Sequence, residues 1–195
     1  MYILGLGGSL HDFSACLLKD SQILSMIEDE RITRDKHGIN LGVRLAKGYS
    51  RKYCLEYNNI QLSDLSLIVA NDIINKSILF RLNDVKFINH HLSHASSAFF
   101  TSPFEESAIL VIDSVGSKLL TDEDNIYETI SYYYGKDNEI ELVEKKTGKN
   151  IPGSDFVENS MGIFYSLITE LIGFSELQED KTMGLAPYGT DHEYK

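Results

Sequence analysis

Short apolar stretches separated by turn residues predict three consecutive strands at the start of the chain. Residues 2–8 form an apolar run that ends in a glycine-rich turn, and residues 13–18 and 22–27 are apolar stretches joined by Lys19-Asp20-Ser21. This pattern is typical of strands paired through tight turns. Because no helical pattern follows the glycines, the chain does not carry the glycine-rich fingerprint of dinucleotide-binding proteins at this position.

The following segments alternate between helix and strand. Residues 41–57 have helical spacing of their large apolar side chains and are stopped by Asn58-Asn59, whereas residues 71–81 fit neither pattern. The other elements predicted from periodicity are strands over residues 67–70, 85–88, 108–112, 129–134 and 140–144, a helix over residues 160–174, and a turn-rich segment over residues 180–189.

Two loops in the first part of the chain carry groups that could meet a ligand. The glycine-rich turn precedes His11 and Asp12, and its N–H groups could approach a phosphate, although a plain hairpin is the simpler explanation. The charged segment of residues 28–38 is either a solvated connector or a loop that delivers Arg31, Lys36 or His37 to an anionic substrate.

The candidate chemistry centres on His90 and His94. The pair follows the predicted strand of residues 85–88 and begins a small-residue helix, so it stands at a strand-to-helix junction, where α/β proteins commonly build their sites. A spacing of four residues places both imidazoles on one helix face, within reach of a single metal ion. The alternative is that both are satisfied core histidines on a buried helix face.

A further candidate ligand follows the apolar run of residues 108–112. Asp113 stands just past the carboxyl end of that predicted buried strand, where an acidic side chain is well placed to bind a ligand or a metal. Capping of a helix or turn is the alternative role for the same carboxylate.

The order of predicted elements repeats along the chain. Residues 19–23 resemble residues 136–140, and both stretches stand at the second turn of a three-strand meander. This similarity indicates two duplicated lobes that begin near residues 2 and 107. We therefore predict an α/β chain of the actin-like type found in sugar kinases and heat-shock ATPases, with a first lobe over residues 1–104 and an incomplete second lobe over residues 105–195.

Composition and charge exclude several classes of protein. The net charge of −11 argues against a nucleic-acid surface, because phosphate binding needs clustered Lys and Arg. The acidic clusters at residues 122–124 and 176–180 are expected to be solvated loops. Cys16 and Cys54 lack C-x-x-C partners and are predicted to be buried thiols in a reducing compartment. The apolar start is too short for a signal peptide or membrane span, so we expect a cytoplasmic protein.

Several stretches together resemble one enzyme family in order and spacing. They are residues 3–5 with His11-Asp12, residues 28–37, residues 89–98, residues 104–116, and residues 181–189 with the motif M-G-L-A-P-Y-G, which is the most specific of them. The chain resembles, over nearly its whole length, the N-terminal part of the O-carbamoyltransferases of nodulation-factor and antibiotic biosynthesis. The resemblance implies a duplicated actin-like fold similar to that of the tRNA threonylcarbamoyl-transferase.

The resemblance also implies a reaction and a set of site residues. In that family a C-terminal domain makes carbamoyl-adenylate from carbamoyl phosphate and ATP. The N-terminal domain then passes the carbamoyl group to a small-molecule hydroxyl at a divalent metal of the iron type, with zinc as the alternative ion. Carried over by motif, the metal ligands are His90, His94 and Asp113, the catalytic residues are His11 and Lys36, and the nucleotide-side residues are Lys181 and Gly184.

The same resemblance predicts an incomplete enzyme. The activating domain, most of the second lobe and a further metal-ligating aspartate would lie beyond Lys195, so we expect the chain alone to be inactive. Uncovered apolar surface would favour self-association or a C-terminal partner. Two alternatives remain open: a non-catalytic remnant that binds a nucleotide or a protein, and an actin-like kinase or ATPase. Such kinases do not use an H-x-x-x-H metal pair, which disfavours the second alternative.

Overall fold

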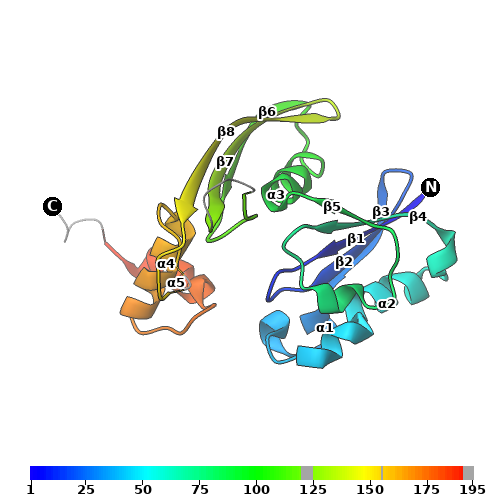
Figure 1. The fold of residues 1–195 in the computed structure, drawn as a ribbon, viewed down its shortest axis with the longest axis horizontal. Helices are drawn as coiled ribbons and strands as arrows, with labels where there is room; N and C mark the ends of the chain where they lie inside the picture. The colour runs from blue at the N-terminus through cyan, green and yellow to red at the C-terminus, as the bar shows by residue number, and fades with distance from the viewer. Residues whose placement is uncertain (120–124, 155, 191–195) are drawn as a thin grey trace. The chain divides into compact units, whose positions relative to one another are not determined.

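The computed structural model describes residues 1–119, 125–154 and 156–190 (Figure 1). The chain divides into two compact units, Met1–Ser93 and His94–Lys195. This division falls inside the helix α3 (His90–Phe99). The lobe boundary between residues 104 and 105 that the sequence suggested stays a prediction.

The first unit is built on a mixed sheet of five strands in the order β3-β2-β1-β4-β5 (Figure 1). Its antiparallel meander consists of β1 (Tyr2–Gly7), β2 (Ser14–Lys19) and β3 (Gln22–Glu28). Two parallel strands, β4 (Leu65–Asn71) and β5 (Val85–Ile88), extend the sheet beyond β1. All five strands predicted for this part of the chain are confirmed.

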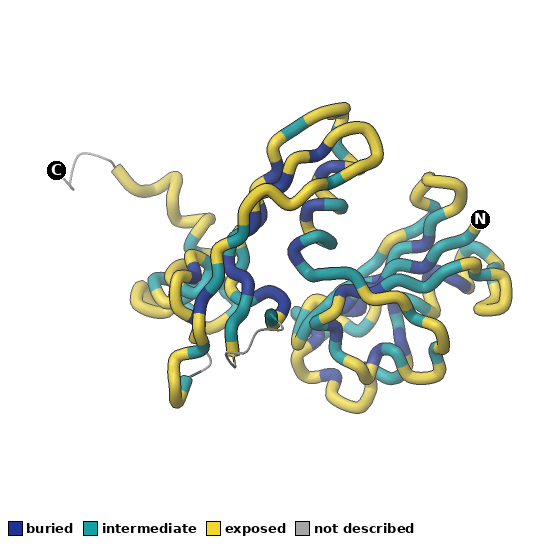
Figure 2. Tube along the Cα trace, turned by 45° about the horizontal axis from the view of Figure 1, so that its top comes forward, coloured by how far each residue is buried: buried dark blue, intermediate teal, exposed yellow. Residues whose placement is uncertain are grey.

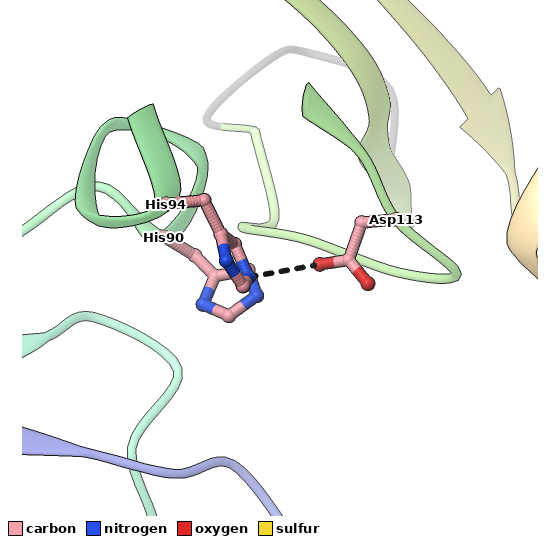
Figure 3. A group of neighbouring side chains, drawn as sticks. All are labelled: His90, His94 and Asp113. Atoms are coloured by element: carbon pink, nitrogen blue, oxygen red, sulfur yellow. Dashed lines mark ion pairs between the residues drawn. The ribbon is translucent and has the colours of Figure 1, made fainter. Parts of the chain in front are cut away.

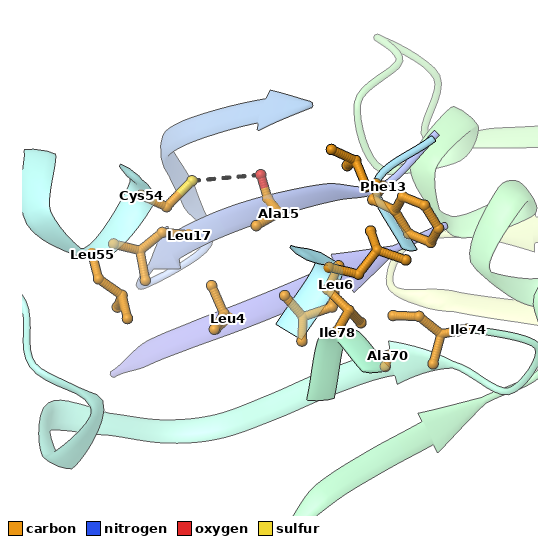
Figure 4. Close-up of a cluster of buried hydrophobic side chains, with 12 residues drawn as sticks. Leu4, Leu6, Phe13, Ala15, Leu17, Cys54, Leu55, Ala70, Ile74 and Ile78 are labelled. Carbon is orange, nitrogen blue, oxygen red and sulfur yellow. Dashed lines mark hydrogen bonds between the residues drawn. The ribbon is translucent and has the colours of Figure 1, made fainter. Parts of the chain in front are cut away.

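The core of the first unit lies between this sheet and the helix α2 (Tyr49–Tyr57) (Figure 4). Leu4 of β1 and Leu17 of β2 are fully buried, and Cys54 of α2 donates a hydrogen bond from Sγ to the Ala15 carbonyl at 3.5 Å. Figure 2 shows buried segments along the strands and exposed loops around them. Cys54 is a buried thiol, as predicted, but Cys16 is only partly buried, so that part of the prediction is wrong.

Three connections differ from the sequence prediction. The charged segment of residues 28–38 is not a plain connector, because it contains the helix α1 (Asp29–Thr33) and the 3₁₀ turn η1 (Lys36–Gly38). The single helix predicted over residues 41–57 is two elements, η2 (Gly42–Lys47) and α2, because Gly48 between them has a φ of 56°. Two further 3₁₀ turns, η3 (Leu62–Asp64) and η4 (Lys76–Leu79), flank β4.

The second unit contains an antiparallel sheet of three strands in the order β6-β7-β8 (Figure 1). These strands are β6 (Glu106–Ile112), β7 (Ile126–Lys136) and β8 (Glu139–Lys149), and the helix α4 (Met161–Leu171) follows them. The three strands and the helix are confirmed. However, β6 is not buried on both faces, because its side chains alternate and Leu110 and Ile112 are exposed.

The end of the described chain is helical rather than turn-rich. The helix α5 (Glu179–Leu185) and the 3₁₀ turn η5 (Ala186–Tyr188) occupy most of residues 180–189, so the predicted turn segment is wrong. Glu179 belongs to α5 and accepts a hydrogen bond from Ser166 Oγ at 2.6 Å, so it is not part of a solvated loop. The acidic cluster of residues 122–124 lies outside the described residues.

Each unit contains a three-strand antiparallel meander, as the sequence repeat predicted. The second hairpin of each meander has a two-residue turn, between paired residues Lys19 and Gln22 in one unit and Lys136 and Glu139 in the other. Asp20 and Asp137 hold the same turn position with φ values of 47° and 54°. Among the described residues, no helix is long and apolar enough to cross a membrane.

Candidate functional site

Helix α3 sets the direction of the H-x-x-x-H pair. The helix begins after Asn89, whose side-chain oxygen accepts a hydrogen bond from the Leu92 N–H at 3.0 Å, in the manner of an N-cap. One face of α3 carries His91, Ala95 and Phe99, which are all buried. Because this face is fixed in the interior, the two spaced histidines are carried on a different side of the helix.

The structure separates the core histidine of α3 from the candidate ligands. His91 is fully buried, whereas His90 is half-buried and His94 is exposed. The alternative of a core histidine is therefore wrong for His94, which is exposed. His90 is half-buried and its Nδ1 is buried, so its role as a metal ligand stays a prediction.

Asp113 directly follows β6 and is held from several directions. Its N–H donates to the Thr129 carbonyl at 3.0 Å, and its Oδ1 accepts a hydrogen bond from the Ser114 N–H at 2.7 Å. The hydroxyl of Ser160, the N-cap of α4, donates to the Ser114 carbonyl at 2.7 Å and lies 3.2 Å from the Asp113 carbonyl. The carboxylate is therefore oriented by its own turn and by the start of α4.

His90, His94 and Asp113 converge on one point (Figure 3). Each offers a ligand atom, and these atoms all lie within 4.8 Å of one another. His94 Nε2 lies 3.9 Å from Asp113 Oδ2. The two imidazoles are positioned by one continuous helix. Two imidazoles and one carboxylate form the donor set of many non-haem iron and zinc sites, so the residues present fit a divalent transition metal.

A second cluster of titratable side chains lies in the first unit and consists of Asp12, Glu30 and His37. Asp12 Oδ2 is 2.7 Å from His11 Nδ1, and Asp12 Oδ1 is 2.9 Å from His37 Nδ1. Glu30 Oε2 accepts a hydrogen bond from the His37 N–H at 2.8 Å. Because these groups already bind one another, the geometry favours a hydrogen-bond network over a second metal site.

The two histidines keep the Asp12 carboxyl ionised. The hydrogen bond with His11 is the main cause that lowers the pKa of Asp12, and the bond with His37 acts in the same direction. Partial burial raises the pKa but is outweighed. On the far side of the cluster, Arg31 lies 3.5 Å from Glu30 Oε1 and balances its charge. The cluster is thus a connected network in which the Asp12 carboxylate joins two histidine rings and Glu30 joins the His37 backbone to Arg31.

The remaining site residues suggested by the sequence occupy three different elements. His11 lies in the loop between β1 and β2, and Lys36 is exposed at the start of η1, directly before His37. Lys181 and Gly184 are both exposed on α5, where the Lys181 Nζ lies 5.7 Å from the centroid of the Phe174 ring. The structure therefore gathers the three metal-ligand candidates but leaves the nucleotide-side pair on its own helix.

The sequence indicated no role for Asp12 or Glu30, and it indicated His37 only as one of three groups that a loop could deliver to an anionic substrate. For Asp12 and His37, adjacency to His11 and Lys36 was the available signal, whereas Glu30 is adjacent to neither. Adjacency in sequence could not show which side chains are in contact, because the contact between Asp12 and His37 depends on the paths of the two loops that carry them. Asp12 and His37 join these loops through both backbone and side chain.

Comparison with known proteins yields one family and several relatives. Residues 74–194 match the model of a family described as the carbamoyltransferase N-terminus. Nodulation protein NolNO of Sinorhizobium fredii is 32% identical over 92% of this chain and 28% of its own length. Nodulation protein NolO of Bradyrhizobium diazoefficiens is 34% identical over 55% of this chain and 16% of its own length. The chain thus spans less than a third of either curated relative.

Among solved structures, a similar chain is the activator of the 2-hydroxyisocaproyl-CoA dehydratase from Clostridium difficile with bound ADPNP. It aligns with a TM-score of 0.57 at 13% identity, covering 98% of this chain and 58% of that chain. At this identity the likeness concerns the fold alone. It confirms the α/β fold of the actin-like ATPase type that the sequence predicted.

Proposed function

The chain belongs to the family of carbamoyltransferase N-terminal domains, and from this premise we propose that it carries the transfer site for a carbamoyl group. The proposed donor is carbamoyl-adenylate, and the proposed acceptor is a hydroxyl of a small molecule. The observation that supports this proposal is the group of His90, His94 and Asp113, which lies within the matched region and has the donor set of a catalytic metal site.

The metal-ligand group is proposed to bind one divalent ion, iron or zinc. Bound there, the ion would supply Lewis-acid polarisation of the carbamoyl oxygen. The chain itself contributes the orientation of the ligands. Helix α3 sets the spacing of the two imidazoles, and the Ser114 N–H fixes one carboxylate oxygen of Asp113. Such outer hydrogen bonds tune both the affinity and the orientation of a metal ligand.

We assign the acceptance of the hydroxyl proton to His11 and the stabilisation of charge on the leaving group to Lys36. The acceptor oxygen forms a bond to the carbamoyl carbon, the bond from that carbon to the adenylate oxygen breaks, and AMP leaves. His11 accepts the proton of the attacking hydroxyl, a role that suits an imidazole near neutral pH. Lys36 offsets the negative charge on the leaving phosphate. Lys181 and Gly184 are proposed to lie on the nucleotide side of the reaction.

A labelled transfer assay tests this function. We expect the chain to be inactive alone, so it is assayed together with the C-terminal part that the family resemblance implies. The completed protein, loaded with Fe²⁺ or Zn²⁺, is given [¹⁴C]carbamoyl-adenylate directly together with a panel of polyols and sugars, and labelled product is quantified. We expect label in at least one acceptor and a loss of about 10²-fold or more in His94→Ala, as for removal of a charge-stabilising group. The matched control is Asp137→Asn in the β7–β8 turn, which should retain the rate, whereas Asp113→Asn should not. Equal rates in the wild type and His94→Ala would contradict the proposal.

A further inference from the structure

Two loops of the first unit are joined at Asp12 and His37. The Asp12 N–H donates to the His37 carbonyl at 2.8 Å, and the Asp12 Oδ1 is 2.9 Å from His37 Nδ1. Both residues adopt left-handed backbone conformations, with φ values of 54° and 58°. Such conformations cost free energy in residues other than glycine and persist where the surroundings enforce them, often at functional sites. The two strained residues here hold each other through two separate bonds.

The Asp12 carboxylate bridges two histidine rings. Its Oδ2 is 2.7 Å from His11 Nδ1, and its Oδ1 meets His37 Nδ1, while the centroids of the two rings are 6.5 Å apart at an interplanar angle of 84°. An ionised carboxylate can only accept hydrogen bonds. Both rings must therefore donate from Nδ1, which places the lone pair of each neutral imidazole on Nε2.

The surroundings of His37 support the same tautomer. Within the part of the chain that the structure describes, His37 Nε2 is buried and has no hydrogen-bond partner. A proton on that nitrogen would bury an unpaired N–H donor, which is costly. The His37 N–H is meanwhile bound to Glu30 Oε2 at 2.8 Å, and Arg31 lies against the other Glu30 oxygen at 3.5 Å. The ring and the backbone of His37 are thus both held in place.

We propose that Asp12 is a positioning residue for carbamoyl transfer, which fixes His11 in the Nδ1–H tautomer so that Nε2 accepts the proton of the acceptor hydroxyl. This inference rests on the proposed function, because it gives His11 the role of base. In the transfer step the proton moves from the acceptor oxygen to His11 Nε2. Asp12 stays ionised and stabilises the imidazolium that forms.

The connection between Asp12 and His37, which we call the loop junction, also positions Lys36. His11 directly precedes Asp12, and Lys36 directly precedes His37, so each proposed catalytic residue is one peptide unit from a member of the joined pair. A weaker loop junction would therefore displace both the proposed base, His11, and the proposed cation, Lys36. Since neither Asp12 nor His37 is assigned to substrate binding, we expect substitution of Asp12 to lower kcat with little effect on the KM for the acceptor.

The substitution Asp12→Asn separates two roles of Asp12, the control of histidine tautomers by its carboxylate and the left-handed conformation of its backbone. Asn tolerates a left-handed conformation as Asp does, but its side chain has one acceptor oxygen where the carboxylate has two. In Asp12→Asn the side-chain amide can accept from only one histidine and must donate to the other. Because the buried Nε2 of His37 disfavours a proton, His11 is the ring expected to change to the Nε2–H tautomer.

The experiment combines ¹⁵N NMR of the histidine-labelled chain with transfer kinetics of the protein completed by its C-terminal part. At about pH 8, above the ordinary histidine pKa of about 6.5, the wild type should show His11 and His37 as Nδ1–H tautomers. Asp12→Asn should convert His11 to the Nε2–H tautomer and lower kcat by about 10²-fold or more. The control is Asp20→Asn, because Asp20 is an exposed turn residue of the same unit with a left-handed backbone. This variant should change neither the histidine tautomers nor kcat.

Each outcome separates this inference from the proposed function. An Nε2–H tautomer at His11 in the wild type overturns the inference without use of any variant, so the test survives if Asp12→Asn fails to fold. A wild-type rate in folded Asp12→Asn overturns it as well. If the wild-type chain shows both predicted tautomers but, once completed by its C-terminal part, transfers no carbamoyl group to any acceptor, the proposed function fails instead.

Discussion

At the scale of single residues, Glu128 shows how one buried carboxylate supports a ligand loop. Its side chain in β7 is fully buried, its Oε2 pairs with Lys145 Nζ, and its Oε1 accepts a hydrogen bond from the Ser117 N–H at 3.0 Å. The Glu128 backbone also exchanges hydrogen bonds with Gly116 and Ser117. The loop that leaves Asp113 is thereby tied to the neighbouring strand.

Substitution of Glu128 tests this role. Glu128→Gln removes the charge that pairs with Lys145 and leaves a largely buried ammonium unpaired, so we expect the free energy of unfolding to fall by about 3 kcal/mol. Urea denaturation of the full chain measures it. The matched control is Glu106→Gln, which breaks an exposed pair with Lys136 on the same sheet and should leave the midpoint almost unchanged. Equal changes in the urea midpoint of the two variants would show that burial does not increase the contribution of the Glu128–Lys145 pair to stability.

The sequence predicted some of these residues and not others for a physical reason. The spacing of His90 and His94 on a helix, and the place of Asp113 after a strand, are local properties that a pattern can show. The bridge from Asp12 to His37 joins residues 25 positions apart through two left-handed turns. Glu128 stands in an alternating strand and has no local sign of its buried partner. Contacts that depend on tertiary structure leave no trace in local periodicity.

At the scale of elements, helix α4 forms the support under the Asp113 loop. Its N-cap residue, Ser160, binds the Ser114 carbonyl, and its second residue, Gly162, packs against the loop backbone. A Cβ at Gly162 would lie 2.5 Å from the Ser114 nitrogen and 2.7 Å from the Asp113 carbonyl carbon. Because both atoms belong to the backbone, the loop would have to move.

We therefore expect Gly162→Ala to weaken metal binding without removing a ligand. Displacement of the Asp113 loop should lower the affinity for Zn²⁺ by about 10- to 100-fold, as for loss of an outer-shell contact. Competition with a chromophoric chelator measures the affinity. Gly184→Ala in α5 is the control, because a Cβ there meets no atom within 4 Å and alanine favours a helix. Unchanged affinity in Gly162→Ala would contradict the support role of α4.

The helical elements that were not predicted from the sequence pattern are short and rich in charged or turn-forming residues. Helices α1 and α5 carry acidic side chains in their first turns, where these favour a helix N-terminus, but the same residues also suggest solvated loops. The break at Gly48 depends on a left-handed backbone that helical spacing of apolar residues does not show. Strands were predicted more reliably because hairpin turns and alternation mark both their ends and their faces.

At the scale of the whole molecule, the repeated meander made the fold predictable. Each unit contains three antiparallel strands and a matching two-residue turn, and the structural likeness to an actin-like activator agrees with this order. The fold alone does not specify chemistry, since one fold serves many reactions. The reaction class comes from the family match over residues 74–194, and the ligand group within that region gives it a location.

The most direct test of the account is the metal content of the full chain, purified anaerobically without an affinity tag and measured by plasma mass spectrometry. If His90, His94 and Asp113 form a metal site, the wild type should contain near-stoichiometric iron or zinc, and His90→Ala combined with His94→Ala should lose it. His11→Ala serves as a control and should retain the metal. Wild-type protein without metal after reconstitution, or a double variant with unchanged metal content, would contradict the account.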